Sequence, residues 1–239
     1  MKQKKLIDYL NYKDILIILG AWYLTAVIIL ITKEIQFQYP LLTNIFHFLF
    51  IISGRFIFFT LVSLYLTSLY SVDFEALGLN FKKFMSQFKD SMSKIGLLFI
   101  LVVVFINIPV SFLTGIEFFP LYKITGPESL ISSLFPFLLV FTACLFISLS
   151  EQFILNIIIF ELFRYTHINR LFSLVFSSLL YSIILVELQP GRILLNTLVA
   201  LISILLYKKK DSIISASLFT AAYYSIYITY IYGFEFIRF

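Results

Sequence analysis

The stretch LFPFLLVFTACLFISLSEQFILNIIIF, residues 134–160, decides the class of this fold. It is long and apolar enough to lie in a membrane, because a spanning helix needs about 20 mostly apolar residues. Its one carboxylate is Glu151, which has Gln152 and Asn156 close by in sequence. An ionisable side chain at bilayer depth costs about 2.5–3.5 kcal/mol on insertion scales, and it usually marks a functional site or a buried partner. Glu151 is therefore the first candidate for a functional residue.

The composition of the whole chain predicts the same class. The 239 residues are 61% hydrophobic and 13% charged, whereas soluble domains are about 45–50% apolar and about 25% charged. We therefore predict an all-α, polytopic transmembrane helical bundle, a single membrane domain over residues 1–239 whose surroundings are the lipid bilayer. The net charge of +5 does not indicate a nucleic-acid partner, because the basic residues are spread over loops. The lone cysteine, Cys144, excludes an internal disulfide.

Seven segments are predicted to span the bilayer: 15–32, 43–69, 96–114, 132–160, 171–187, 193–207 and 212–232. The basic residues give the orientation, because cytoplasmic loops carry an excess of lysine and arginine. With the N-terminus inside, most of the 18 basic residues fall in inside segments. This predicts a cytoplasmic N-terminus and an extracytoplasmic C-terminus. Richness in Lys, Ile, Phe, Tyr and Asn is typical of an AT-rich genome, so the predicted location is a bacterial plasma membrane.

Residues 81–95 predict a different element, an amphipathic helix on the cytoplasmic surface of the membrane. Apolar residues recur at three- and four-residue spacing, lysines fall on the other side, and Asn80 is a candidate N-cap. The apolar set is Phe81, Phe84, Met85, Phe88, Met92 and Ile95. Such a helix lies in the interface with its lysines toward anionic headgroups. The alternative is that its apolar face packs on the bundle.

A second charged residue, Arg55, lies near the middle of the second predicted span. Arginine stays charged in proteins, so inside a membrane it needs a counter-ion or a wet cavity. The second and fourth spans run in the same direction, which places Arg55 and Glu151 at comparable depth. We therefore predict a buried ion pair between them. The alternatives are that Arg55 extends toward the membrane surface or contacts backbone carbonyls or Glu161.

The remaining polar residues predict no metal or cofactor site. His47 and His167 lie near opposite membrane surfaces in this topology, and neither has an i,i+4 partner of a metal-binding motif. Glu161 and Arg164 are three residues apart and are expected to pair on one helix face. The longest extracytoplasmic loop, residues 115–129, is a candidate contact with a partner.

Four short motifs follow one another along the chain. They are FEALGL at residues 74–79, SEQFILN at 150–156, SSLLYSIIL at 177–185, and the span that starts at Asp211-Ser212. In their order and spacing, and over residues 130–230 in particular, they resemble the CPBP family, also called the Abi or CAAX-protease-like membrane peptidases. The positions that match the family's motif residues are Glu151, Gln152, Asn156, Tyr181, Leu185, Thr220 and Tyr224.

The match is degenerate at the positions that carry the family's chemistry. The family has a second glutamate where this chain has Gln152, and an arginine where it has Asn156. Its two histidines correspond to Leu185 and Thr220, and its asparagine corresponds to Tyr224. The resemblance implies enzymes in which a carboxylate activates water while histidine and asparagine stabilise the oxyanion.

Of that set only the first glutamate, Glu151, is present. Losing oxyanion donors costs orders of magnitude in rate. We therefore predict a pseudoenzyme, a non-catalytic CPBP-like scaffold or regulator that binds and positions a partner membrane or cell-envelope protein. The alternative is an intramembrane enzyme, a glutamate-dependent peptidase or an acyl-transfer enzyme, that acts on a lipid-embedded or lipidated substrate. Glu151 would then be the catalytic base, with hydroxyls from Tyr181, Thr220 and Tyr224 in support.

Overall fold

The computed structural model describes residues 6, 9–32, 34–38, 40–75, 77–81, 84–102, 127–166, 169–185 and 190–226. Their regular secondary structure is all helical, without a strand, as the sequence predicts. In chain order the elements are α1 (Tyr12–Thr32), α2 (Pro40–Tyr70), α3 (Phe84–Val102), α5 (Pro127–Gln152), η3 (Phe153–Phe160), α6 (Glu161–Tyr165), α7 (Arg170–Ile184), α8 (Pro190–Lys210) and α9 (Ile213–Ile226).

Three of the described helices are long and apolar enough to cross a membrane: Tyr12–Thr32, Phe46–Tyr70 and Phe137–Tyr165. They correspond to the first, second and fourth predicted spans. Leu171–Ile184 and Ile213–Ile226 are shorter apolar helices. Of the third predicted span, residues 96–114, only the part up to Val102 lies within the described residues, and that part is helical. The architecture is therefore compatible with a helical membrane bundle.

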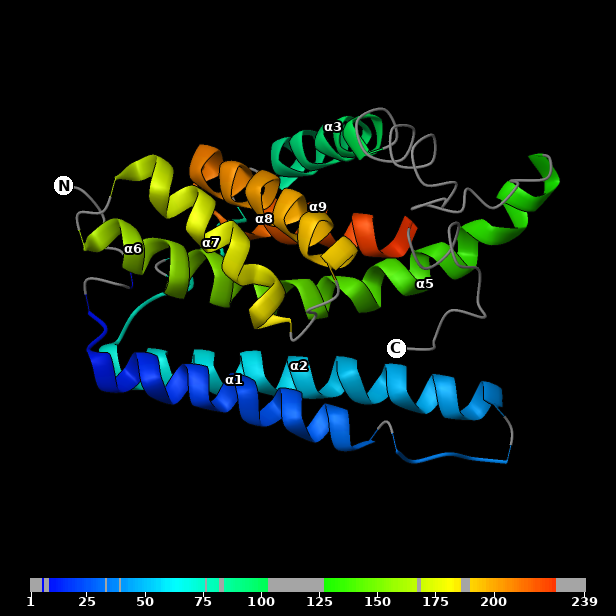
Figure 1. Ribbon diagram of the computed structural model, residues 1–239, viewed down its shortest axis with the longest axis horizontal. Helices are drawn as coiled ribbons and strands as arrows, with labels where there is room; N and C mark the ends of the chain where they lie inside the picture. The colour runs from blue at the N-terminus through cyan, green and yellow to red at the C-terminus, as the bar shows by residue number, and fades with distance from the viewer. Residues whose placement is uncertain are drawn as a thin grey trace.

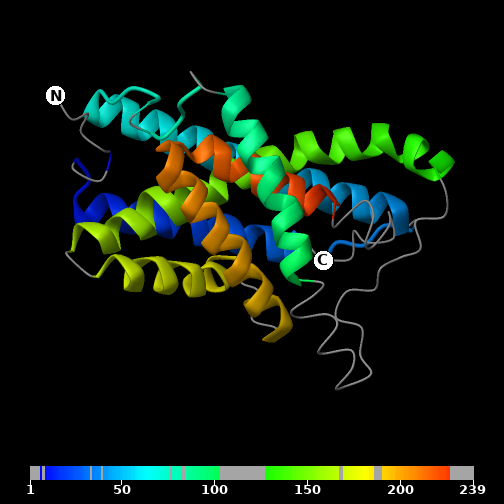
Figure 2. The same cartoon turned by 90° about the horizontal axis from the view of Figure 1, so that it is seen from above.

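The helices form a two-helix layer and a larger bundle (Figures 1 and 2). The layer consists of α1 and α2, which lie side by side. It packs on the bundle mainly through α2 against α5. Trp22 of α1 is fully buried, and its indole N–H donates to the carbonyl of Ile184 at the end of α7, 2.9 Å away. The ring of Phe58 meets the Trp22 ring edge-on at 5.2 Å between centroids. Trp22 thus anchors the layer to the bundle.

Helix α9 is the centre of the bundle. It packs against α5, α3 and α8, and almost all of its residues are buried. A helix that is apolar on all sides lies in a protein core or in a membrane, and here other helices surround it. The small residues Ser212, Ser215 and Ala216 are completely buried at its start, and small side chains of this kind let neighbouring backbones approach closely. The position of α9 therefore determines which side chains meet in the core.

The segment between α2 and α3, which contains the FEALGL motif, packs on the start of α9. Leu77 and Leu79 are buried there. Between them, Gly78 adopts a left-handed backbone with φ of 79°, which is costly for any residue with a Cβ atom. The carbonyl of Gly78 accepts a hydrogen bond of 2.9 Å from the backbone N–H of Ile213. The motif therefore holds an otherwise unpaired donor in the first turn of α9.

Helix α3 differs from the predicted surface helix in its bounds and in its faces. It begins at Phe84 and runs to Val102, so the predicted helix 81–95 and the start of the third predicted span are one helix. Asn80 lies before this start, and its backbone carbonyl accepts a 2.8 Å hydrogen bond from the side chain of Gln87. Gln87 and Ser91 are buried against the bundle, whereas Met85 is 75% exposed. The buried stripe continues with Ile95 and Leu98, so apolar spacing alone did not reveal that its first half is polar.

Candidate functional site

Glu151 lies in the last turn of α5, where three helices meet. Its Oε2 accepts hydrogen bonds from the hydroxyl of Tyr181 on α7, at 2.8 Å, and of Tyr224 on α9, at 3.2 Å. The two hydroxyls are 3.2 Å apart. The Glu151 side chain is only 5% exposed and Tyr181 is completely buried. Two phenols therefore hold the carboxylate inside the protein, which offsets part of the cost of burying it.

A second group of hydrogen bonds begins at the next residue, Gln152. The Gln152 side chain donates to the hydroxyl of Thr220 on α9 at 2.9 Å, and it accepts from the amide of Asn156 at 2.7 Å. The Thr220 hydroxyl in turn donates to the backbone carbonyl of Ala216. All three polar side chains are completely buried. The hydrogen bonds that link Asn156, Gln152 and Thr220 thus join the fourth predicted span to the central helix, α9.

Directly after Glu151 and Gln152 the helix widens into a π-helix, Phe153–Phe160, whose residues are all buried. Asn156 lies in this segment, and Glu161 follows it. Widened turns of this type are rare and frequently occur at functional sites. Neither hydropathy nor residue spacing predicts this geometry, because an apolar run of this kind is equally compatible with an α-helix.

Arg55 faces the same region from α2. Its guanidinium carbon lies 3.6 Å from the centre of the Trp22 ring, and one of its nitrogens donates to the Thr25 hydroxyl at 3.4 Å. Arg55 is buried and lies within electrostatic range of Glu151. Its direct contacts are thus with α1, and a direct ion pair with Glu151 stays a prediction, supported by this attraction.

The remaining motif position, Leu185, makes only apolar side-chain contacts. It caps the end of α7, where its N–H donates to the carbonyl of Tyr181 at 3.0 Å. Its side chain packs against the core. The structure therefore places the other six motif positions in two hydrogen-bonded groups of three, whereas the Leu185 side chain makes only hydrophobic contact.

Some buried polar atoms near this cluster have no hydrogen-bond partner in the described part of the chain. They are Asn156 Oδ1 and the hydroxyls of Ser148, Ser177 and Ser182. Ser177 and Ser182 flank Tyr181 on α7, and Ser148 precedes Glu151 by three residues. Buried polar groups are usually satisfied, so such atoms need an explanation.

Two further buried carboxylates also accept hydrogen bonds from tyrosine hydroxyls. Asp14 is 3% exposed and accepts hydrogen bonds from Tyr65 and Tyr70 at the end of α2. Glu161 accepts from Tyr207 of α8 at 3.1 Å and pairs with Arg164 at 3.3 Å, which confirms the predicted i,i+3 pair.

Sequence reasoning missed Asp14 because its tyrosines lie more than 50 residues away. One local signal was present, the spacing Asn11-x-x-Asp14 of a capping box. The structure contains this box: the Asn11 side chain accepts from the Asp14 N–H, and Asp14 accepts from the Asn11 N–H.

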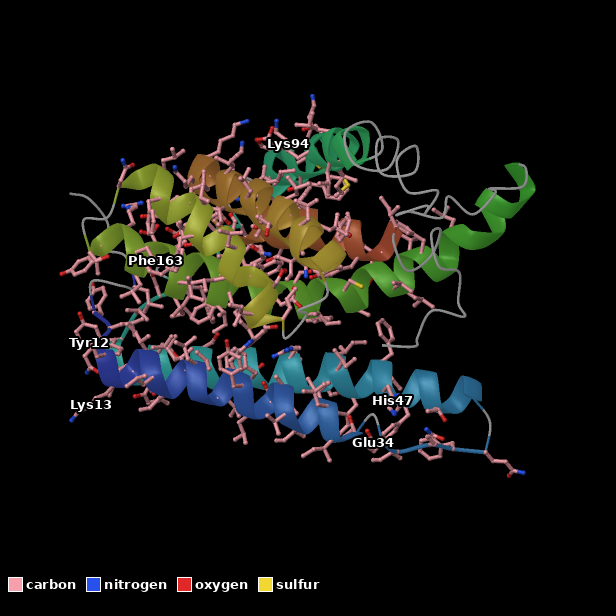
Figure 3. All side chains as sticks on the ribbon, viewed as in Figure 1. Tyr12, Lys13, Glu34, His47, Lys94 and Phe163 are labelled. Atoms are coloured by element: carbon pink, nitrogen blue, oxygen red, sulfur yellow. The ribbon has the colours of Figure 1, made fainter. Side chains whose placement is uncertain are left out.

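The other predicted residues do not join the site. His47 contacts the backbone carbonyl of Ile35 near the far end of the α1–α2 layer (Figure 3). His167 and most of the loop 115–129 lie outside the described residues. Within the residues that the structure describes, no three His, Cys, Asp or Glu side chains form a group able to hold a metal ion.

No protein-family model, curated protein or solved structure matches this chain. The chemistry available to the Glu151 cluster therefore has to be inferred from the geometry of the cluster itself. It holds a buried carboxylate that accepts from two phenols and is attracted by an arginine.

Proposed function

We propose that this protein is a non-catalytic membrane scaffold or regulator that binds and positions a partner membrane or cell-envelope protein. The observation that carries the proposal is the environment of Glu151. Its Oε2 accepts two phenolic hydrogen bonds, and the side chain is 5% exposed. A general base has to reach the proton that it abstracts, directly or through one water molecule. A carboxylate held in this way stabilises the bundle by joining α5, α7 and α9.

The other motif positions support the same function. We propose the resemblance to the CPBP family for residues 130–230. An enzyme of that family would need its oxyanion-stabilising residues at positions 185, 220 and 224. Leu185 has no polar side-chain atom. The Thr220 hydroxyl is used by Gln152 and by the carbonyl of Ala216. Tyr224 is used by Glu151. These hydroxyls serve contacts between helices, as expected where an ancestral site has become part of the core.

A scaffold also needs an outer surface that suits a membrane partner. The outward side of α7 is a run of exposed large apolar residues: Leu171, Phe172, Val175, Phe176, Leu179 and Ile183. In a membrane such a face contacts lipid or the helices of another protein, and association there depends on close packing. The extracytoplasmic loop 115–129 is the second proposed contact surface.

The proposed location is a bacterial plasma membrane with a cytoplasmic N-terminus, and the arrangement of the helix ends supports this orientation. The start of α1 and the ends of α2, α6 and α8 lie toward the same end of the molecule (Figure 1). Lys13, Arg164 and Lys208–Lys210 belong to these ends. An excess of basic residues at one end is typical of the cytoplasmic side.

The alternative function, an intramembrane enzyme acting on a lipidated or lipid-embedded substrate, is favoured by one observation. Four buried polar atoms without partners among the described residues belong to residues close in sequence to Glu151, Gln152 or Tyr181. If these atoms bound a substrate or a water molecule, Glu151 would be the candidate base.

Purification from native membranes in a mild detergent tests the proposal. A tagged copy of the full chain is expected to retain a second membrane or envelope protein near one-to-one stoichiometry. The amount is measured by quantitative mass spectrometry, with an unrelated tagged multi-pass protein as the control. If no protein is enriched near stoichiometry over that control, the scaffold function is wrong.

A further inference from the structure

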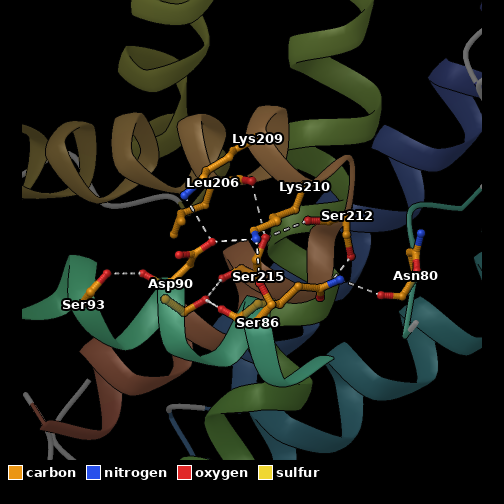
Figure 4. Close-up of polar contacts among 11 residues, drawn as sticks. Asn80, Ser86, Asp90, Ser93, Leu206, Lys209, Lys210, Ser212 and Ser215 are labelled. Carbon is orange, nitrogen blue, oxygen red and sulfur yellow. Dashed lines mark hydrogen bonds and ion pairs between the residues drawn. The ribbon is translucent and has the colours of Figure 1, made fainter. Parts of the chain in front are cut away.

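The first half of α3 and the end of α8 form a composite basic surface. Lys209 and Lys210 of α8 both reach Asp90 of α3, at 3.2 and 2.7 Å from its Oδ2 (Figure 4). Lys210 also donates to the hydroxyl of Ser86 at 2.8 Å. Lys210, and then Lys209, lower the pKa of Asp90 through these contacts, so Asp90 is ionised at neutral pH. Asp90 thereby connects two basic segments that are about 120 residues apart in sequence.

This surface has an excess of positive charge. The described charged residues of α3, of the end of α8 and of the turn after it are five lysines, Lys89, Lys94, Lys208, Lys209 and Lys210, and two aspartates, Asp90 and Asp211. Of the three lysines of α8, Lys209 and Lys210 contact α3, whereas Lys208 lies over the ring of Phe160. Lys89 is exposed and has no ion pair with any described residue, and the Lys209 side chain is 60% exposed although it contacts Asp90. Lys94 lies on the outer side of the molecule above α3 (Figure 3). Since one aspartate serves two lysines, the surface remains attractive to anions.

An exposed apolar face lies next to these lysines. Phe84, Met85 and Phe88 are exposed and lie on one side of α3, and Phe81, which precedes the helix, is also exposed. A different side of α3 packs on the bundle: the Ser91 hydroxyl donates to the carbonyl of Ser215 at 2.7 Å, and Ser212 contacts Gln87. The aromatic face is therefore not the one that holds α3 in place.

The direction of α3 is across the long helices, so α3 runs along the membrane plane if those helices span it. Its axis crosses those of α1, α2 and α5, which are long enough to span (Figure 2). Its polar contacts are with the first residues of α9, directly after the three lysines that end α8. A helix with an apolar face and lysines beside it binds a bilayer by inserting the face and pairing the lysines with lipid phosphates.

We propose that Lys89 of α3 and Lys209 of α8, beside the aromatic face of α3, form a binding site for the phosphate headgroups of anionic phospholipids. The apolar face inserts at the acyl boundary, and the two lysines contact the headgroup above it. Asp90 fixes the distance between the two helices and so holds the lysines together. This site is independent of the proposed scaffold function, because it requires neither Glu151 nor a protein partner.

Native mass spectrometry of the full-length protein tests the site. In detergent, the protein is titrated with phosphatidylglycerol and, separately, with phosphatidylcholine. The wild-type protein is expected to prefer phosphatidylglycerol. Replacing Lys89→Gln together with Lys209→Gln is expected to weaken that binding by about five-fold per lysine, the usual contribution of a basic residue near an anionic surface. The matched control is Lys13→Gln, an exposed lysine on the opposite side of the molecule from Lys94 (Figure 3).

The outcomes separate the lipid from other anions and from misfolding. Lys89→Gln alone leaves the contacts of Asp90 intact, so it should lower phosphatidylglycerol binding without changing thermal stability. If inorganic phosphate displaces the lipid at similar concentration, the site binds free phosphate and the proposal is wrong. An unchanged preference in the double variant, or an equal loss in Lys13→Gln, would also overturn it.

Two spin-labelled variants test whether the apolar face of α3 inserts into the bilayer. Met85→Cys places a label on the exposed face, and Ser93→Cys places one on an exposed position of the same helix away from that face. Native Cys144 is buried and does not compete for the label. In phosphatidylglycerol vesicles, the label at position 85 is expected to be more accessible to oxygen than to a water-soluble nickel complex, with the reverse at 93. Equal nickel accessibility at both positions would show that α3 does not contact the bilayer.

Discussion

Replacing Arg55 with methionine is expected to destabilise the protein by about 3 kcal/mol, the usual cost of removing one member of a buried charged pair. The guanidinium leaves the face of Trp22, and Glu151 loses the cation within its electrostatic range. Unfolding by SDS in mixed micelles measures the loss. Trp22 is the single tryptophan of the chain, so its fluorescence reports directly on this contact. Arg164→Met is the matched control, because Arg164 is half-exposed and such pairs contribute about 0–1 kcal/mol.

A double-mutant cycle isolates the interaction between the two charges. Arg55→Met and Glu151→Gln are combined, and the unfolding free energy of the double variant is compared with the two single changes. We expect a coupling of about 1 kcal/mol or more, since neutralising Glu151 removes the need for a cation. Strictly additive costs would mean that Arg55 stabilises the protein through Trp22 and Thr25 alone, and the predicted pairing with Glu151 would be wrong.

Gly78→Ala is expected to destabilise the protein by about 2 kcal/mol or more, from left-handed backbone strain and overpacking combined. A Cβ atom at this position would lie 3.1 Å from Ile157 and 3.2 Å from Ile213. Both neighbours are buried. Moving Ile213 would also disturb the hydrogen bond that its N–H donates to the Gly78 carbonyl. The same SDS titration measures the change.

Gly20→Ala is the control for this substitution. Gly20 lies in the middle of α1 at an exposed position, and a Cβ atom there meets nothing within 4 Å. Alanine should therefore stabilise the helix by about 0.5–1 kcal/mol. If the two alanine variants behave alike, the FEALGL segment does not hold the start of α9 in the way described.

Hydropathy predicted much of the architecture because a long apolar run leaves few alternatives. The helices from Tyr12, Phe46 and Phe137 match three of the predicted spans, since each contains enough apolar residues to cross a bilayer. Their side-chain contacts were harder to foresee. The Trp22 indole meets the carbonyl of Ile184, 162 residues away, and no local pattern indicates a contact with a backbone atom at that separation.

The candidate site was predictable in its residues and less so in its interactions. Motif spacing singled out Glu151, Tyr181 and Tyr224, and these side chains meet. Spacing could not show that the two tyrosines donate to one oxygen, because that depends on how α7 and α9 are rotated about their axes. For α3 the periodicity marked an apolar side that is exposed at Phe84, Met85 and Phe88. The buried stripe begins with Gln87 and Ser91, which contact Ser212 and Ser215, and continues with Ile95 and Leu98. The rotation of a helix follows from its neighbours, which the sequence of the helix alone does not contain.

Glu151→Gln tests the central claim, that Glu151 holds the bundle together and does not catalyse a reaction. The variant is produced in the native membrane in an amount matched to the wild type, because loss of the charge that attracts Arg55 is expected to lower its stability, and its correct folding is checked by Trp22 fluorescence. Cellular activity and the amount of co-purifying partner are then measured side by side. We expect both to stay at the wild-type level, because glutamine keeps an oxygen that can accept a tyrosine hydroxyl. Loss of activity with protein level, folding and partner unchanged would contradict the claim and would indicate that Glu151 acts as a catalytic base.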